Sequence, residues 1–366
     1  MSNNLRIGWI PPSRNLKSAS FRLRVDEIMK GLRGRGHTCF YYDESADSDV
    51  LIVSKKYDLG TQVAMRHYRS RNPKGIIVFD ICDNHFYTDS KNTQDLVEYE
   101  SRVKMLRSAL VEADAVTTAS EYLAGVVAEQ CQIDSRSIFT IEDCYEQSQT
   151  KFRPSGVVEY IAEIQYKWLE WRLNWTNKLD ERFVWFGTHG VSYAEGGMFD
   201  LLERAKIITE AFRDSDRSLT IISNSYSKYR EVSKTLKIRT YYLPWSKHTI
   251  DRALRLHTFL LLPIKASPFT LSKSINRPVT AMLNKLLVVC DMIPSYEKLS
   301  DYLINPIQHD SLTHVLSMSK EERARRVHAA RAHVHNEYSP ARITEKWESV
   351  LFYVINDKIK VPTSDF

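Results

Sequence analysis

Glycines cluster in a loop at residues 187–198, between an expected strand and an expected helix. The strand at 183–186 leads into the letters GTHG, and Gly196 and Gly197 stand directly before the helix expected at 199–212. Glycine lets a backbone approach a phosphate closely, and the first turn of a helix offers unpaired N–H groups to an anion. The loop matches neither a Walker A motif nor a GxGxxG fingerprint. It indicates phosphate binding, with a strand-to-helix turn that needs positive φ as the alternative.

A second polar group precedes a helix that leads into a buried strand. Its members, within the segment 272–291, are Lys273, Ser274, Asn276 and Arg277. Cations at the start of a helix oppose the helix dipole, so their presence is easier to explain if an anion binds there. Pro278 is typical of a first helical turn. The segment predicts an anion site, and a solvated basic loop is the alternative.

Polar residues also follow the strands expected in the N-terminal half. Ser18, Ser20, Arg22 and Arg24 follow the first strand, and Asp80, Asp83 and His85 lie at the end of another. In open α/β sheets, ligands bind outside the carboxyl ends of the strands. The arginine fork suits phosphate, and a carboxylate at this place can orient an acceptor hydroxyl. The alternatives are exposed arginines at a helix start and a capping role for Asp83.

Short β-rich runs alternate with helical segments in both halves of the chain. Strands are expected at 5–10, 38–42, 49–54, 75–81, 115–118 and 137–141, and again at 183–186, 219–223, 240–243, 258–263 and 286–291. This alternation predicts parallel sheets covered on both faces. At roughly 150 residues per domain, the 366 residues predict two domains. We therefore expect an α/β chain with two Rossmann-like domains.

The segment between the two halves, 151–180, predicts an interdomain helix. Trp168, Trp171 and Trp175 are three and four residues apart, so they share one helix face. We expect this aromatic face to pack against a domain, as the apolar stripes of amphipathic helices generally do. The expected division is a first domain at 1–150, a helical linker at 151–180 and a second domain at 181–339.

The composition is that of a mildly basic globular protein, with 51 Lys and Arg against 45 Asp and Glu. This balance favours phosphate-bearing small molecules or an anionic membrane surface, and it is too weak to indicate nucleic acid. The basic helix expected at 320–335 is a candidate for lipid contact, with a solvated face as the alternative. Scattered cysteines and the absence of zinc-ligand spacing predict no metal site. No secretory signal and no membrane span are recognised, which predicts a cytoplasmic protein.

The motifs follow one another in an order that resembles GT-B glycosyltransferases near family 4, the group 1 enzymes. The quoted residues are Val78-Phe79-Asp80-Ile81-x-Asp83, Ala113-Asp114-Ala115-Val116-Thr117, Ser120-Glu121-Tyr122-Leu123, Phe186-Gly187-x-His189-Gly190, Pro263-Ile264, Lys273-Ser274-x-Asn276-Arg277, Ala281-Met282 and Val288-Val289-x-Asp291. Members often carry a Glu-x7-Glu run whose second glutamate holds the nucleotide ribose. Here these two positions are Ser272 and Thr280.

The resemblance implies two Rossmann-like domains that face each other across a cleft, with the final helix, within 340–366, crossing back to the first domain. It assigns the nucleoside-diphosphate sugar to the second domain. The donor-binding residues would be Gly187, His189, Gly190, Gly196, Gly197, Trp245, Lys273, Ser274, Asn276, Arg277 and Thr280. Purely structural roles are the alternative for His189 and Trp245.

The same resemblance assigns a glycan or lipid-linked acceptor to the first domain, as in polysaccharide biosynthesis. The acceptor-binding residues would be Ser20, Arg22, Arg24, Asp80 and Asp83, and the catalytic residues Asp83 and His189. Transfer would be retaining, without cofactor or metal. A sugar-nucleotide epimerase or phosphorylase-like enzyme on the same fold remains an alternative, as does a non-catalytic partner subunit. Peripheral contact with the inner face of a membrane fits a lipid-linked acceptor.

Overall fold

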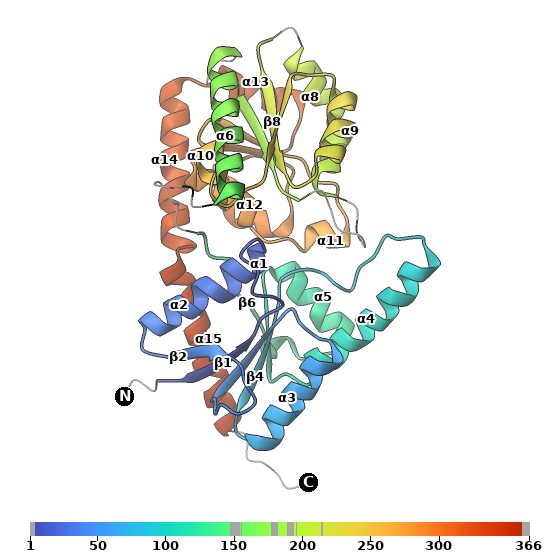
Figure 1. The fold of residues 1–366 in the computed structure, drawn as a ribbon, viewed down its shortest axis with the longest axis vertical. Coiled ribbons are helices and arrows are strands. Elements are labelled where there is room, and N and C mark those ends of the chain that lie inside the picture. Colours follow the sequence, from blue (N-terminus) through green and yellow to red (C-terminus); the bar gives the residue numbers. More distant parts are fainter. Residues whose placement is uncertain are drawn as a thin grey trace. The chain divides into compact units, whose positions relative to one another are not determined.

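The computed structural model describes residues 4–146, 154, 156–176, 182–188, 194, 196–213 and 215–360. The chain forms two compact units (Figure 1). Unit 1 comprises Met1–Glu146, Leu271–Ser274 and Glu337–Phe366, and unit 2 comprises Gln147–Thr270 and Ile275–Asn336. The short segment Leu271–Ser274 therefore packs with the first half of the chain, although its position in the sequence lies deep within the second.

Unit 1 is built on a six-stranded parallel sheet with the order β2-β1-β3-β4-β5-β6. Its strands are β1 (Arg6–Ile10), β2 (Thr38–Tyr41), β3 (Val50–Ser54), β4 (Ile76–Ile81), β5 (Ala115–Thr118) and β6 (Ile138–Thr140). Its helices are α1 (Ala19–Phe21), a π-helical turn (Arg22–Asp26), α2 (Glu27–Gly34), α3 (Leu59–Arg71), α4 (Thr93–Val111), α5 (Glu121–Cys131), a 3₁₀ turn (Ser135–Ser137) and α15 (Pro340–Lys360). The order reverses between β1 and β3, which makes this pair the switch point of a doubly wound sheet.

Both faces of this sheet are covered, which is why its central strands are continuous apolar runs. Every residue of β3 and β4 is buried. Apolar side chains from α3, α4 and α5 complete the core on one face, including Met65, Leu106 and Leu123. Asp58 caps the N-terminus of α3, and Ser120 caps that of α5. Each side chain accepts a hydrogen bond from a backbone N–H of the first turn.

The last helix, α15, belongs to unit 1 and packs beside α2 (Figure 1). Its Trp347 contacts Trp9 of β1, with ring centroids 5.6 Å apart and both side chains fully buried. A side chain at Gly31 of α2 would collide with Thr344, so glycine allows the two helices to approach closely. Glu348 accepts hydrogen bonds from Arg35. The predicted return of the last helix to the N-terminal domain is confirmed.

Unit 2 has a second six-stranded parallel sheet, with the order β12-β11-β10-β7-β8-β9. Its strands are β7 (Arg182–Phe186), β8 (Ser218–Ser223), β9 (Thr240–Pro244), β10 (Phe259–Leu262), β11 (Leu287–Cys290) and β12 (Leu303–Ile304). Its helices begin with α6 (Val157–Thr176), a 3₁₀ turn (Gly197–Phe199), α7 (Asp200–Glu203), α8 (Ala205–Phe212), α9 (Tyr226–Leu236) and α10 (Ile250–Leu254). The others are α11 (Pro268–Leu271), α12 (Asn276–Leu283), a 3₁₀ helix (Pro294–Tyr302), α13 (His309–Ser317) and α14 (Lys320–Glu337), of which α11 and α14 each end with one residue assigned to unit 1. The order reverses between β7 and β10, the Rossmann pattern.

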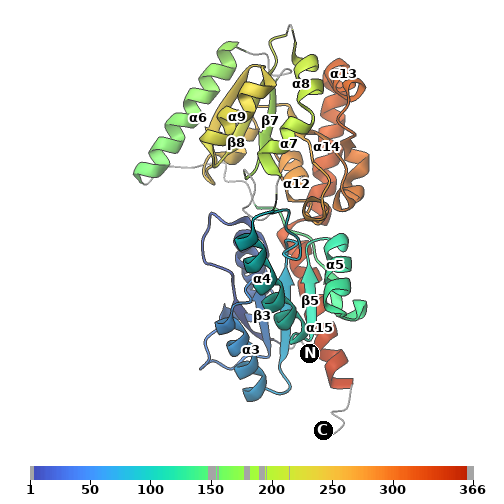
Figure 2. The same ribbon diagram turned by 90° about the vertical axis from the view of Figure 1, so that its right-hand side faces the viewer.

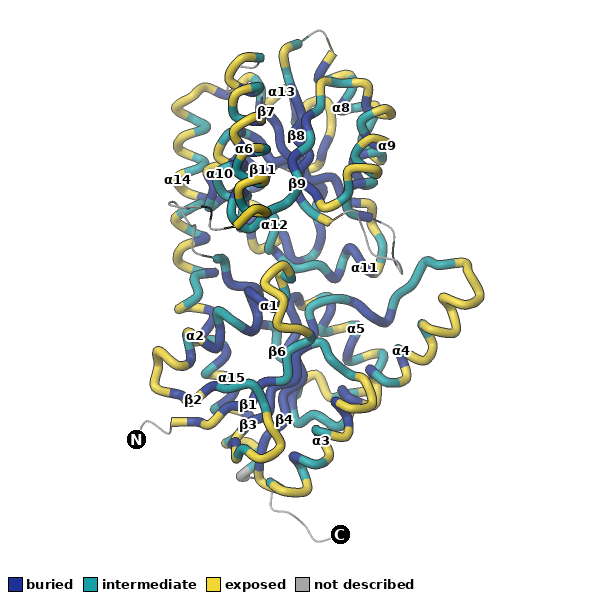
Figure 3. Tube along the Cα trace, viewed as in Figure 1, coloured by how far each residue is buried: buried dark blue, intermediate teal, exposed yellow. Residues whose placement is uncertain are grey.

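Helix α6 forms as predicted, but its tryptophan face does not pack against a domain. The exposed fractions are 49% for Trp168, 59% for Trp171 and 80% for Trp175. The helix instead buries its opposite side, through Tyr166, Leu169 and Leu173. Figure 2 shows α6 at the edge of unit 2, and Figure 3 shows its exposed residues. The prediction was wrong because the helix carries two apolar stripes and the shorter one makes the contact.

Among the described residues, no helix combines the length and the apolar composition that crossing a bilayer requires.

Acid pH should destabilise unit 2 through the buried His257. Its Nδ1 lies 2.8 Å from the carbonyl oxygen of Ala253, which can only accept, so Nδ1 donates and Nε2 accepts from the Thr220 hydroxyl at 2.7 Å. Burial of the neutral ring, followed by the charge of Arg182, lowers its pKa to about 4. As the pH falls below about 6.5, the unfolded chain binds a proton on this ring and the folded chain does not. The contribution of His257 to the free energy of unfolding is therefore lost as the pH falls from about 6.5 to about 4.

We expect the free energy of unfolding to fall by about 2 kcal/mol through His257 alone between about pH 7 and 5. Urea unfolding at the two pH values, for the wild type and His257→Gln, measures this contribution as the difference in their pH dependence. His314→Asn, at an exposed histidine of the same unit, should keep the wild-type dependence. An unchanged pH dependence in His257→Gln would show that this ring is not held neutral.

Candidate active site

The carboxyl ends of β7 and β10 form the switch point of the unit 2 sheet. Gly187 follows β7 directly, and Pro263 to Lys265 follow β10. The backbone N–H of Gly187 donates to the carbonyl of Ile222 on β8, at 3.1 Å. A parallel sheet of this topology opens a crevice at this place, because the connections from the two strands leave toward opposite faces. The glycine loop predicted to bind phosphate therefore begins where ligands bind in such sheets.

The glycines of this loop have the backbone conformations that glycine favours. Gly196 has a φ of 132° and Gly197 a φ of 75°, in the region that other residues rarely adopt. A side chain at Gly187 would lie 3.1 Å from the ring of Trp185 and 3.7 Å from Nη1 of Arg277. The alternative expectation for the loop, a turn that needs positive φ, is confirmed at Gly196 and Gly197, and phosphate binding stays a prediction. His189 and Gly190 lie outside the described residues.

Asp200, the first residue of α7, is a candidate that the sequence did not single out. Its side chain is buried, and Oδ2 accepts a hydrogen bond from the N–H of Gly197 at 3.0 Å. Within the described part of the chain, Oδ1 has no hydrogen-bond partner. Burial raises the pKa of the carboxyl to about 6, opposed first by the Arg277 charge and then by the N–H of Gly197. The sequence did not indicate Asp200, because an acidic residue in the first turn of a helix is usually an ordinary cap.

Arg277 is a cation beside this switch point. It stands in the first turn of α12, and its charge acts on Asp200 and on the buried phenol of Tyr296. None of the described residues forms a hydrogen bond with its guanidinium. The neighbouring Asn276 accepts a hydrogen bond from the hydroxyl of Thr280, 3.1 Å away. Arg277 therefore carries a charge that is available to an anion beside the glycine loop.

The polar group at 273–277 is divided between the two units. Lys273 and Ser274 belong to unit 1, whereas Asn276, Arg277 and Thr280 belong to unit 2. The sequence treats them as one cluster because they are adjacent in the chain. Trp245 follows β9, which lies two strands away from the switch point. Its backbone N–H donates to the carbonyl of Ser223 at 2.9 Å.

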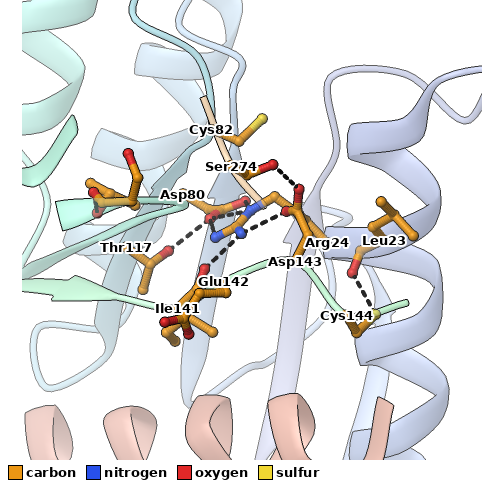
Figure 4. A network of polar contacts seen from close by, with 12 residues as sticks. Leu23, Arg24, Asp80, Cys82, Thr117, Ile141, Glu142, Asp143, Cys144 and Ser274 are labelled. Carbon is orange, nitrogen blue, oxygen red and sulfur yellow. Dashed lines mark hydrogen bonds and ion pairs between the residues drawn. The ribbon is translucent and has the colours of Figure 1, made fainter. Parts of the chain in front are cut away.

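Arg24 and Asp80, both predicted to bind the acceptor, bind each other in a buried network of unit 1 (Figure 4). Nη2 of Arg24 lies 2.6 Å from Oδ1 of Asp80, and each side chain is 2% exposed. Nη1 donates to Asp143 at 3.0 Å and to the carbonyl of Ile141 at 2.8 Å. These two residues have a structural role instead. Their buried ion pair and hydrogen bonds connect the segment of Arg24, the end of β4 and the segment that carries Asp143.

The same network extends to two further residues. The hydroxyl of Thr117 donates to Asp80 at 2.9 Å, and the hydroxyl of Ser274 donates to Asp143 at 2.6 Å. Ser274, which the resemblance places at the donor, therefore ties the segment Leu271–Ser274 to the strand ends of unit 1. Asp143 belongs to the letters Glu-Asp-Cys that follow the last strand of the first half.

Two more of the predicted acceptor residues follow β1, Ser20 in α1 and Arg22 in the π-helical turn. Arg22 donates from Nε to Glu146 at 2.7 Å and from Nη1 to the carbonyl of Leu16 at 2.8 Å. The hydroxyl of Ser20 lies 2.9 Å from that of Ser18. Arg22 is buried, so it orders this loop and the segment that carries Glu146.

Asp83 is held between two lysines at the carboxyl ends of β3 and β4. Lys273 Nζ lies 2.6 Å from Oδ1, and Lys55 forms an ion pair with Oδ2. Lys55 has a φ of 53°, an uncommon conformation for a residue with a side chain. Although burial opposes ionisation, the two ammonium groups hold the pKa of Asp83 well below its usual range. Asp83 is therefore an anion at neutral pH that accepts hydrogen bonds and is a weak general base.

A neutral histidine adjoins this charged group. Nδ1 of His85 lies 2.7 Å from the hydroxyl of Tyr57. Burial, and then the charge of Lys55, lowers the pKa of His85 to about 4. Lys55, Asp83 and Lys273 together carry one net positive charge beside a group that stays neutral. Nowhere in the described part of the chain do three His, Cys, Asp or Glu side chains form a group that could hold a metal ion.

No family model and no curated protein matches the sequence. Solved structures do match the fold. HepE of Anabaena in complex with UDP has a TM-score of 0.63 and 12% identity, covering 95% of this chain and 100% of that one. A glycosyltransferase of Rickettsia africae has a TM-score of 0.60 and 12% identity, covering 98% and 99%. AviGT4, a glycosyltransferase involved in avilamycin A biosynthesis, has a TM-score of 0.56 and 11% identity, covering 96% and 98%.

These likenesses span nearly the whole of each chain. The predicted GT-B fold is therefore confirmed, with two Rossmann-like units and a parallel sheet in each. The identities are too low to carry more than the fold.

Proposed function

We propose that the chain is a glycosyltransferase that moves a sugar from a nucleoside-diphosphate sugar to a hydroxyl of a glycan or a lipid-linked acceptor. One observation carries the proposal. The glycine loop and the cation Arg277 come together at the β7/β10 switch point, where sheets of this topology bind ligands. The UDP in the Anabaena structure of the same fold supports this choice of ligand class.

Unit 2 would bind the donor through its diphosphate. The N–H groups of the loop and the guanidinium of Arg277 would meet the phosphate oxygens, and Asp200 orders the loop through its bond to Gly197. Thr280, one helical turn after Asn276, would contact the ribose, and Trp245 the base, as the resemblance implies. His189 stays a sequence-based proposal for the sugar or the pyrophosphate.

Unit 1 would serve the acceptor. Asp83 would accept a hydrogen bond from the acceptor hydroxyl and fix its direction, and Arg22 and Ser20 would order the neighbouring loop. Because the pKa of Asp83 is lowered, this carboxylate orients the hydroxyl without taking its proton in the ground state. A retaining transfer fits this division, because the donor diphosphate can then accept the proton while it departs. The stereochemistry rests on the family resemblance.

Transfer should survive chelation. We propose that the leaving diphosphate is stabilised by Arg277 and by loop N–H groups, the role of preorganised charge in transition states. Activity in excess EDTA should therefore equal activity in buffer with added Mg²⁺. A complete loss in EDTA that Mg²⁺ or Mn²⁺ restores would contradict this proposal.

A panel of UDP-, GDP-, ADP- and CMP-sugars tests donor binding by thermal shift. A ligand that binds only the folded chain stabilises it by RT ln(1 + [L]/Kd), which is about 2.7 kcal/mol at about 100 times Kd. We expect one nucleotide class to raise the melting temperature and the free nucleoside to leave it unchanged. No shift with any member at millimolar concentration would contradict the proposed function.

A further inference from the structure

Helix α6 carries a continuous apolar face that no other described part of the chain covers. Its members are Val157, Ile161, Ile164, Trp168, Trp171 and Trp175, hereafter the outer stripe. They are spaced four, three, four, three and four residues apart, which places them on one side of a helix. Their exposed fractions run from 49% for Trp168 to 80% for Trp175. Large apolar side chains gathered in this way mark an interaction site, whereas single exposed ones do not.

The outer stripe is held rigidly in place. The opposite side of α6 packs through Leu169 and Leu173, which are fully buried. Glu163 forms an ion pair with Arg252 of α10, and Glu159 lies 3.2 Å from Nε2 of His248. The stripe is therefore a fixed feature of unit 2. Packing within unit 2 already uses the other face of the helix.

We propose that the outer stripe binds the interface of a lipid bilayer that contains anionic headgroups. Three of its six members are tryptophan, the side chain that prefers the level of the headgroups because its ring is apolar and its N–H is polar. Trp171 and Trp175 stack with ring centroids 6.3 Å apart, so they would enter the interface as one surface. An amphipathic helix lying in the plane of the interface buries its apolar face in this way.

One basic residue beside the outer stripe, Arg172, fits an anionic surface. The charged residues that border it on α6 are Lys167, whose Nζ pairs with Glu170 at 2.8 Å, and Arg172, whose guanidinium lies over the rings of Trp168 and Tyr241. The glutamates of α6 lie on the other side, where Glu163 pairs with Arg252 and Glu170 accepts from the hydroxyl of Tyr166. At the end of the helix, Arg239 contacts the carbonyl of Thr176 and lies 3.5 Å from the carboxylate of Asp216. Basic residues near anionic lipid add to the binding that apolar burial provides.

A second copy of the chain fits the outer stripe less well. Helix pairs with this spacing fill their seam with leucine, isoleucine or valine, which match the holes of the partner, and tryptophan is too large for most of them. The proposal does not depend on the glycosyltransferase activity, because it rests on α6 alone.

The helix that the sequence indicated for lipid contact, α14, is a weaker candidate in the structure than α6. In α14, Arg325 and Arg326 both pair with Glu322. Among the described residues, the exposed large apolar side chains include none from α14. Charge without an apolar face gives weaker attachment than the two together. Variants in α14 therefore provide the matched control for variants in α6.

Co-sedimentation with large vesicles tests the proposal. The full chain should bind vesicles of phosphatidylcholine with phosphatidylglycerol more tightly than vesicles of phosphatidylcholine alone. Since full burial of a large apolar side chain changes a partition coefficient about tenfold, Trp171→Ser with Trp175→Ser should weaken binding to both vesicle types by up to ~100-fold. Arg172→Gln should weaken binding to anionic vesicles alone, by about fivefold. Arg325→Gln in α14 should bind like the wild type.

Two further readouts keep the test decisive. The tryptophan variants should melt like the wild type, because the replaced rings are exposed, and lipids brominated in the acyl chain should quench wild-type tryptophan fluorescence more than that of the double variant. Equal vesicle binding by the wild type and the double variant would overturn the proposal, as would an absence of vesicle binding. A wild-type dimer in light scattering that the double variant converts to a monomer would assign the stripe to a second copy instead.

Discussion

Replacing Asp83 by asparagine should slow sugar transfer by ~10²–10⁴-fold, the usual contribution of a positioned carboxylate, and leave donor affinity nearly unchanged. The carboxylate orients the acceptor hydroxyl in our proposal, and it also holds Lys55 and Lys273. Asparagine keeps the shape but loses the charge that both lysines require. Steady-state kinetics with donor and acceptor varied separately measures the effect, and Asp47→Asn, at an exposed carboxylate of unit 1, is the matched control.

The effect of Asp83→Asn should not depend on pH over the neutral range. The pKa of Asp83 is lowered, so its contribution to stability is present above the ordinary value of about 3.9 and is lost only as the pH falls through the lower folded value. At neutral pH the group is ionised in every molecule. A melting curve separates slow turnover from unfolding. Wild-type turnover in Asp83→Asn would remove this residue from the mechanism.

Replacing Arg277 by alanine should weaken the binding of nucleoside diphosphates by ~1.5–3 kcal/mol, the scale of hydrogen bonds to charged groups. The guanidinium lies beside Gly187 and acts on Asp200, so its loss removes the cation of the switch point. Isothermal titration with the nucleoside diphosphate of the best donor measures the change. The corresponding nucleoside, which lacks phosphate, should bind the wild type and Arg277→Ala alike. Arg325→Ala, an exposed arginine of unit 2, is the control.

Lys273→Ala separates two explanations of the same sequence segment. The sequence predicts that Lys273 and Arg277 hold the diphosphate together. In the structure, Nζ of Lys273 lies 2.6 Å from Asp83 in unit 1. We therefore expect Lys273→Ala to affect acceptor turnover more than nucleotide affinity, and Arg277→Ala to do the reverse. Equal losses of nucleotide affinity in the two variants would restore the predicted single cluster.

The architecture could be predicted because buried parallel strands leave a simple trace in sequence. The runs at Val50–Ser54 and Ile76–Ile81 are buried on both faces, so they contain hardly any polar residue. Other elements carry no such trace. Strand β12 has two residues, and the helix Leu59–Arg71 was not predicted because most of its residues are polar. Helix α4 begins at Thr93, in a stretch without apolar periodicity.

The candidate site could be predicted less well, because its contacts join residues far apart in the chain. Arg24 reads as an exposed residue at a helix start, yet its partner Asp80 is 56 residues away and both are buried. Two adjacent residues can also belong to different units, as Ser274 and Ile275 do. Glycine, by contrast, reports a local requirement of the backbone, and the alternative that Gly196 and Gly197 form a turn with positive φ is confirmed.

Release of nucleoside diphosphate from the best donor tests the central claim most directly. The chain is incubated with that donor, with and without a membrane and glycan extract, and the released nucleotide is measured by liquid chromatography. We predict release that rises with the extract, that is slow in Asp83→Asn, and that needs a higher donor concentration in Arg277→Ala. A donor that binds but stays intact under all of these conditions would contradict a glycosyltransferase, and its conversion to another sugar nucleotide without an acceptor would identify an epimerase.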